Sequence, residues 1–244
     1  MCYSGAIFMF HIIGILLAIS GLLIGLFLPS IFEKVINQIR RRESEETKEE
    51  LTTYCKSSKD YILLGLGNSI MYMMLYYIGG IPKEPITQTG WIELIIYCIT
   101  ATLLLAVVVI DWNTYEIPFG INVCILLLGL IRVGLDYHNW SLYIIGFFAV
   151  SGFLFLLYWI SGGSWIGGGD VKLMAAAGLL LGWKQIVVAF VVGCVLGSII
   201  HLTIMAVSKS KHMLAFGPYL SMGIYFSMLW GEQLASWYLS LFKI

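Results

Sequence analysis

Long apolar runs occupy most of this chain, and short polar stretches separate them. An apolar run of about 20 residues can cross the hydrocarbon of a bilayer as a helix, because a helix satisfies its backbone hydrogen bonds internally. The pattern therefore predicts an all-α, polytopic membrane protein, with residues 1–244 forming a single membrane-embedded domain. Eight helices are expected, of which the sixth is short, at residues 7–31, 61–78, 91–110, 118–135, 141–160, 171–181, 185–207 and 218–241.

Composition supports a lipid environment. The chain is 59% hydrophobic and 11% charged, with 8 Trp and 14 Tyr, and its mean hydropathy is +0.90. A soluble core of 244 residues does not have this composition. The formal net charge is zero, so no general affinity for nucleic acid is expected.

Charge is concentrated in one predicted loop, residues 33–60 between the first two helices. Seven of the 14 Lys and Arg residues lie there, beside several glutamates. By the positive-inside rule this loop is cytoplasmic, and eight spans then place both termini outside. Lys209 and Lys211 fall in a second predicted cytoplasmic loop, which agrees with this orientation. Residues 1–29 are too apolar over too long a run for a cleaved signal peptide, so we expect them to remain.

Cysteine and histidine give no metal or disulfide pattern. The five cysteines contain no CxxC pair, and the four histidines are dispersed along the chain. We therefore expect neither a disulfide framework nor a zinc site.

Two aspartates interrupt the apolar pattern. Asp170 follows three glycines, Gly167, Gly168 and Gly169, and Asp111 ends the apolar run 101–110. A carboxylate beside apolar spans indicates a functional site, because its burial is energetically unfavourable. With the predicted topology, both lie at the cytoplasmic edge of the membrane, one where the third helix ends and one where the sixth begins. They share one depth, as two groups acting on one water molecule must.

If the two carboxyls meet, they cannot both ionise in a poorly solvated site and must share a proton. The pair then offers a base that activates water and an acid that polarises a peptide carbonyl, without metal or covalent intermediate. Each aspartate alone also fits a helix cap, Asp111 before an ordinary polar turn and Asp170 as an N-cap.

The residues around the aspartates have expected roles as well. Gly167, Gly168 and Gly169 are expected to unwind the entry to the sixth helix and to let substrate backbone approach. Lys172 is expected to balance charge or to reach lipid phosphates. Glu116 lies in a short polar turn, where it is either solvated or orients substrate.

Four segments resemble the type IV prepilin peptidases, the GxGD class of intramembrane aspartyl proteases. Residues 167–174 (GGGDVKLM) resemble the family's second-aspartate motif, and residues 111–118 (DWNTYEIP) are similar to its first. Residues 216–220 (FGPYL) resemble the start of its last helix. Residues 21–29 (GLLIGLFLP) resemble its first-helix signature, in which Ser and Asn usually replace Leu26 and Pro29.

The resemblance implies removal of a short basic leader from prepilin-like or pseudopilin precursors, at the cytoplasmic face of a bacterial-type inner membrane. It implies catalysis by Asp111 and Asp170. We also predict that Glu116, Pro118, Gly217 and Pro218 can orient substrate. The expected partners are these precursors and membrane lipids, with no nucleic acid.

One departure from the family concerns its second activity. Many relatives methylate the new N-terminus with S-adenosylmethionine, and many carry two zinc-binding CxxC pairs in the first loop, where this chain has only Cys55. We therefore predict peptidase activity without zinc and leave methylation open.

Two other classes of function remain as alternatives. A proton-coupled transporter would use Asp111 and Asp170 as relay groups near the bilayer midplane, on discontinuous helices of two related halves. A non-enzymatic scaffold for pilus or secretion assembly would tolerate replacement of both aspartates.

Overall fold

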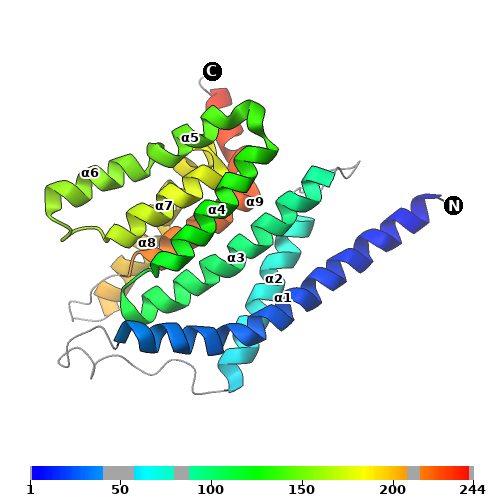
Figure 1. Cartoon of the computed structure of the whole chain (residues 1–244), viewed down its shortest axis with the longest axis horizontal. Helices are drawn as coiled ribbons and strands as arrows, with labels where there is room; N and C mark the ends of the chain where they lie inside the picture. Colours follow the sequence, from blue (N-terminus) through cyan, green and yellow to red (C-terminus); the bar gives the residue numbers. More distant parts are fainter. Residues whose placement is uncertain (1, 41–57, 80–87, 208–214, 242–244) are drawn as a thin grey trace. The chain divides into compact units, whose positions relative to one another are not determined.

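The computed structural model describes residues 2–40, 58–79, 88–207 and 215–241. All regular structure in these ranges is helical (Figure 1). The elements are α1 (Cys2–Arg40), α2 (Ser58–Tyr77), α3 (Gln88–Thr114), α4 (Phe119–Leu135), the 3-10 helix η2 (Tyr137–Asn139), α5 (Trp140–Ala149), α6 (Ser151–Ser161), α7 (Gly168–Leu181), α8 (Trp183–Val207) and α9 (Gly217–Leu241).

Each of the eight predicted helices has a counterpart, and the predicted all-α class is confirmed. The fifth predicted helix is divided at Val150 into α5 and α6. The first extends to Arg40, so residues 33–40 are helical rather than part of the predicted loop. Residues 41–57, which include Cys55, and the basic segment at 208–212 lie outside the described residues.

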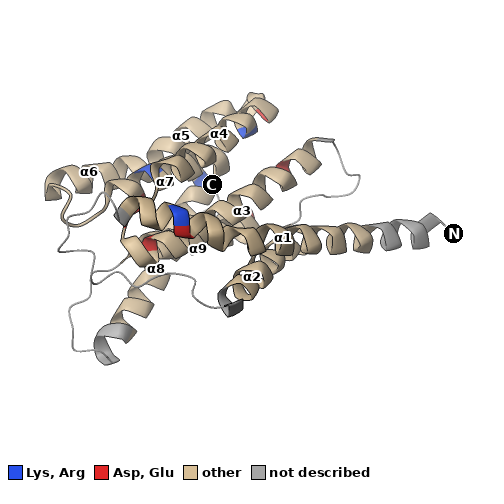
Figure 2. Ribbon diagram, turned by 60° about the horizontal axis from the view of Figure 1, so that its bottom comes forward, with Lys and Arg blue, Asp and Glu red and all other residues tan. Residues whose placement is uncertain are grey.

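Four described segments are long and apolar enough to cross a membrane. They are Phe10–Ile39, Thr89–Thr114, Tyr137–Ser161 and Trp183–Thr203, and Phe119–Leu135 is a shorter apolar helix. Charged residues are sparse along the helices, as the almost entirely tan ribbons of Figure 2 show. The chain is a multi-pass membrane protein.

The chain divides into two compact units, residues 1–106 and 107–244, with α3 contributing to both. In the first unit, α1 packs on α2 through small residues. A Cβ atom added at Gly25 would lie 2.6 Å from the Cα of Gly65. Small residues allow this close backbone approach, which favours association of helices in lipid.

A buried polar network links all three helices of the first unit. The Asn68 side chain donates to the carbonyl of Gly21 at 3.0 Å and accepts from the Thr102 hydroxyl at 3.0 Å. The Tyr72 hydroxyl lies 2.8 Å from the same Thr102 oxygen. Because Asn68 is fully buried, these bonds supply the partners that lipid cannot.

The second unit is organised around α7, in which nine of 14 residues are buried. It contacts α4, α5, α6, α8 and α9. Its closest neighbour is α5, because the backbones at Gly146 and Gly178 touch and a Cβ atom at either position would meet backbone of the other helix. The helix that begins beside Asp170 is therefore the centre of this unit.

We expect Gly178→Val to destabilise the second unit by about 1–3 kcal/mol, the range typical of overpacking. The added side chain would meet the backbone of α5, which cannot move away as a flexible side chain could. Thermal unfolding in detergent measures the effect. Gly152→Val is the matched control, because a Cβ atom at Gly152 meets nothing within 4 Å. Equal melting temperatures for the two variants would contradict the proposed contact.

Candidate active site

Asp111 lies in the last turn of α3, which continues past the predicted end at Ile110 to Thr114. The next residue, Tyr115, lies outside the helix and has a φ of 54°, in the left-handed region. The Thr114 hydroxyl donates to the Ile110 carbonyl at 2.9 Å, which completes the last turn. Asp111 is 4% exposed. The interpretation of Asp111 as a helix cap is wrong, because the residue lies inside the helix.

Asp170 is the third residue of α7, not its first. Gly167 is the N-cap, with extended φ and ψ of −72° and 141°, while Gly168 and Gly169 are already helical. The prediction that all three glycines unwind the helix entry is therefore wrong, since two of them form its first turn. The N-cap interpretation of Asp170 is also wrong.

The Asp170 carboxylate instead reaches back along its own helix. It accepts a hydrogen bond from the backbone N–H of Gly167. This is the reciprocal half of a capping box, in which the third helical residue satisfies the N–H of the N-cap. Asp170 is 8% exposed, so this bond holds a buried carboxyl in a defined position.

Asp111 receives its hydrogen bond from another helix. The backbone N–H of Gly217, the first residue of α9, donates to Asp111 Oδ2 at 3.1 Å. A Cβ atom at position 217 would lie 2.7 Å from that oxygen, so the approach requires glycine. The positive end of the α9 dipole also faces the carboxyl. Gly217, expected to orient substrate, contacts Asp111 directly.

Ile117 lies between the starts of the two helices. Its Cβ is 3.1 Å from a Cβ atom added at Gly169, and its Cδ1 is 3.1 Å from one added at Gly217. The turn after α3 thus contacts the residue before Asp170 and the residue that binds Asp111. The two carboxyls lie within range of direct electrostatic interaction, so the second unit brings both predicted aspartates into one cluster.

The other predicted residues lie around this cluster rather than in it. Glu116 is exposed, Pro118 is the N-cap of α4, and Pro218 is buried in the first turn of α9. Lys172 is exposed, with Nζ 5.4 Å from the centre of the Phe119 ring. At about 100° of rotation per helical residue, Lys172 faces away from Asp170 across α7.

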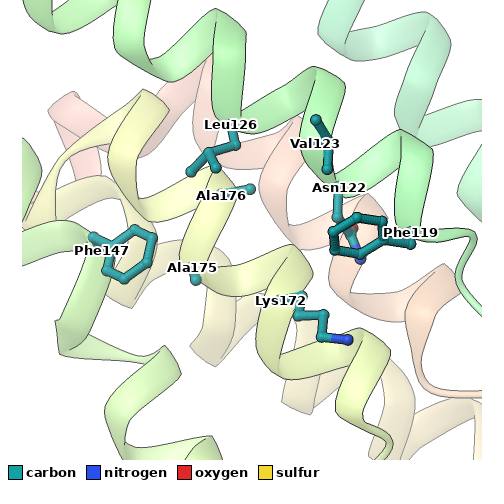
Figure 3. A pocket seen from close by; sticks show the side chains of 8 residues that line it. All are labelled: Phe119, Asn122, Val123, Leu126, Phe147, Lys172, Ala175 and Ala176. Atoms are coloured by element: carbon teal, nitrogen blue, oxygen red, sulfur yellow. The ribbon is translucent and has the colours of Figure 1, made fainter.

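A cavity of about 160 Å³ opens on that far face of α7. Figure 3 shows it between side chains of α4, α5 and α7. Asn122 lines it and is 4% exposed, with Nδ2 3.5 Å from the Gly169 carbonyl. Neither Ile117 nor Asn122 was predicted as a site residue. Ile117 could have been found, since it precedes Pro118 in the first-aspartate motif.

The described residues contain no group of three His, Cys, Asp or Glu that could hold a metal ion. Cys98, Cys124 and Cys194 are free thiols. The described part of the chain therefore does not fit a zinc site of the kind that the family's CxxC pairs form. The geometry instead supplies two buried carboxyls, each held by one backbone N–H, beside a tight turn. Such a pair can activate a water molecule and protonate a carbonyl oxygen.

Comparisons with known proteins relate the segment that carries both aspartates to one family. The model of the type IV leader peptidase family matches residues 98–202, which include both aspartates. The prepilin leader peptidase/N-methyltransferase of Aeromonas salmonicida (strain A449) is 35% identical over 100 residues, covering 38% of this chain and 34% of the relative. That of Pectobacterium carotovorum is 31% identical over 140 residues, covering 54% and 50%.

A relative from Bacillus subtilis (strain 168) with the same name is 29% identical over 155 residues, covering 62% of this chain and 61% of the relative. The chain thus matches between about a third and three fifths of the length of these relatives. No solved structure matches. The resemblance seen in the sequence is confirmed, since residues 98–202 of this chain match the model of the type IV leader peptidase family.

Proposed function

We propose that this chain is a membrane-embedded aspartyl endopeptidase that removes the leader of prepilin-like or pseudopilin precursors. Asp111 and Asp170 are its catalytic pair. The observation that carries the proposal is the cluster in which these two buried carboxyls, from separate helices, each accept one backbone N–H around Ile117. The relatives' names, which include prepilin leader peptidase, supply the substrate class.

The chemistry needs one carboxylate and one carboxylic acid. The carboxylate takes a proton from water as the water oxygen attacks the carbon of the scissile peptide bond. The protonated partner donates to the carbonyl oxygen. The tetrahedral intermediate then collapses and the C–N bond breaks. The leaving amine takes the proton that the base had accepted, and a hydroxyl of the intermediate returns its proton to the partner carboxylate as the C=O bond re-forms. The pair ends with one shared proton, as it began.

Gly217 and Gly167 have positioning roles in this scheme. Their N–H groups hold each carboxyl where it can reach one water. Catalysis by paired groups depends on such placement, because a displacement of about 1 Å can lower the rate about 100-fold. A side chain at position 217 would also displace the carboxyl, since its Cβ atom would lie 2.7 Å from Asp111 Oδ2.

The proposed orientation follows the charge distribution of the chain. The basic residues between 33 and 60 place that segment in the cytoplasm, and the aspartate cluster then lies at the cytoplasmic edge, with both termini outside. A basic leader held in the cytoplasm would present the cleavage point, just before the apolar helix of the precursor, at this depth.

Asp111→Asn and Asp170→Asn are each expected to abolish cleavage, with losses of about 100- to 10,000-fold, because an amide is neither base nor acid. The assay incubates purified protein with a prepilin-type precursor and measures product mass. Glu33→Gln is the control, since Glu33 is an exposed carboxylate of the first unit. Full cleavage by either asparagine variant would contradict the two-aspartate mechanism.

The same mass measurement tests the second activity of the named relatives. S-adenosylmethionine is added to one of two parallel reactions with wild-type protein. A product heavier by one methyl group only in that reaction assigns methylation to this chain, and identical masses restrict it to cleavage.

Gly217→Ala is expected to lower kcat by about tenfold or more while KM changes little, because position 217 contacts the Asp111 carboxyl rather than substrate. The matched control is Gly120→Ala, also a glycine in the first turn of a helix but with open space where the Cβ would lie. A raised KM with unchanged kcat would instead assign Gly217 to substrate binding.

A further inference from the structure

A second cavity, of about 190 Å³, lies in the second unit far from the aspartates. Leu181 lines it at the end of α7, which is 11 residues or about 16 Å along the helix from Asp170. The polar residues that line it come from four segments: Arg132 and Asp136 at the end of α4, Tyr143 of α5, Lys184 and Gln185 of α8, and Glu232 of α9.

The connection between α7 and α8 creates this cavity. Gly182 is the only residue between the two helices, and its φ of 82° is a value that glycine adopts readily. Its N–H donates to the Gly178 carbonyl at 2.9 Å and closes α7. The direct connection places the first turn of α8, with Lys184 and Gln185, around the same cavity as the last turn of α4.

The lining combines two cationic and two anionic side chains, so its formal charge is zero. Tyr143 donates to Asp136 Oδ2 at 2.9 Å, and Gln185 Nε2 donates to Glu232 Oε2 at 3.4 Å. The other amide atom of Gln185, Oε1, is buried and has no hydrogen-bond partner among the described residues. A buried acceptor of this kind needs a donor, which a water molecule or a polar ligand in the cavity would supply.

A ligand that fits this lining therefore carries two groups. One is an anion, which would face the two cationic side chains, and the other is an N–H cation, which would donate to Glu232 and to Gln185 Oε1. A phosphoethanolamine group has both. The surroundings match a lipid head group, since Trp183 and Tyr143 are of the aromatic types found at head-group level, and Leu142 and Leu181 add apolar surface. A cavity of about 150 Å³ accommodates a benzene ring, so one of about 190 Å³ has room for this group.

We propose that this cavity binds the head group of phosphatidylethanolamine, with Arg132 and Lys184 facing the phosphate, and Glu232 and Gln185 accepting from the ammonium. Phosphatidylcholine presents a quaternary ammonium without N–H and cannot donate to Gln185 Oε1. Phosphatidylglycerol has no cation for Glu232. The site thus distinguishes three phospholipids that share a phosphate, and it does so independently of the proposed peptidase reaction.

The test is native mass spectrometry of the full chain released from detergent after incubation with each of the three lipids at equal concentration. Phosphatidylethanolamine is expected to be retained about tenfold more than either other lipid, the ratio that one charge-assisted hydrogen bond supplies. Equal retention of all three overturns the proposal. A second arm adds soluble glycerophosphoethanolamine at the same concentration as the lipid, and complete displacement of the lipid at this equal ratio would overturn a membrane lipid as the occupant.

A double variant, Lys184→Met with Glu232→Gln, assigns binding to this cavity. We expect it to lose the preference for phosphatidylethanolamine, whereas Lys34→Met with Glu33→Gln retains it, because that exposed pair lies on α1 in the first unit. Both doubles remove one charge of each sign. If the cavity variant kept the melting temperature and also the preference, the lipid would bind elsewhere and the proposal would fail.

Discussion

Burial of two carboxyls near each other is the constraint on which the arrangement of the second unit depends. Burial of a polar group without a hydrogen bond destabilises a fold, and burial of a charged group destabilises it more. Here each carboxyl receives one backbone N–H, Asp111 from Gly217 and Asp170 from Gly167. Both donors belong to helix N-termini, which carry N–H groups without intrahelical partners. The start of α9 must therefore meet the end of α3, and the N-cap of α7 must be small enough to leave space for the acid.

The family resemblance was based on sequence motifs, and the contacts in the structure explain why the motifs contain these residues. Because Gly169 has no side chain, Ile117 can pack against its backbone, and the absence of a side chain at Gly217 leaves space for the Asp111 carboxyl. Ile117 contacts both glycine positions and so joins the first-aspartate motif to the other two. Residues that occur as separate short signatures along the chain are in this way parts of one packed cluster.

The sequence predicted the helices well because apolar runs and polar breaks are local signals. It also indicated both aspartates as candidate site residues and predicted that they lie at the same edge of the membrane. It did not predict that α3 continues through Asp111, because a polar residue after an apolar run usually indicates the end of a helix. The hydrogen bond that Asp111 accepts comes from Gly217, which is 106 residues later in the chain. The contact of Gly217 with Asp111 could not be predicted for the same reason, because the two residues are far apart in sequence. Asn122 gave no signal within an ordinary apolar helix.

The backbone contact of Gly146 with Gly178 has a mechanical consequence for the reaction cycle. Two helices that touch through glycine backbones resist sliding past each other, because a shift of either helix would bring larger side chains to the contact. α7 is thereby held at a fixed height against α5, and Asp170 with it. Any adjustment that admits a peptide between the two acids must therefore come from the segments that carry Asp111, Ile117 and Gly217, while Asp170 remains the stationary reference.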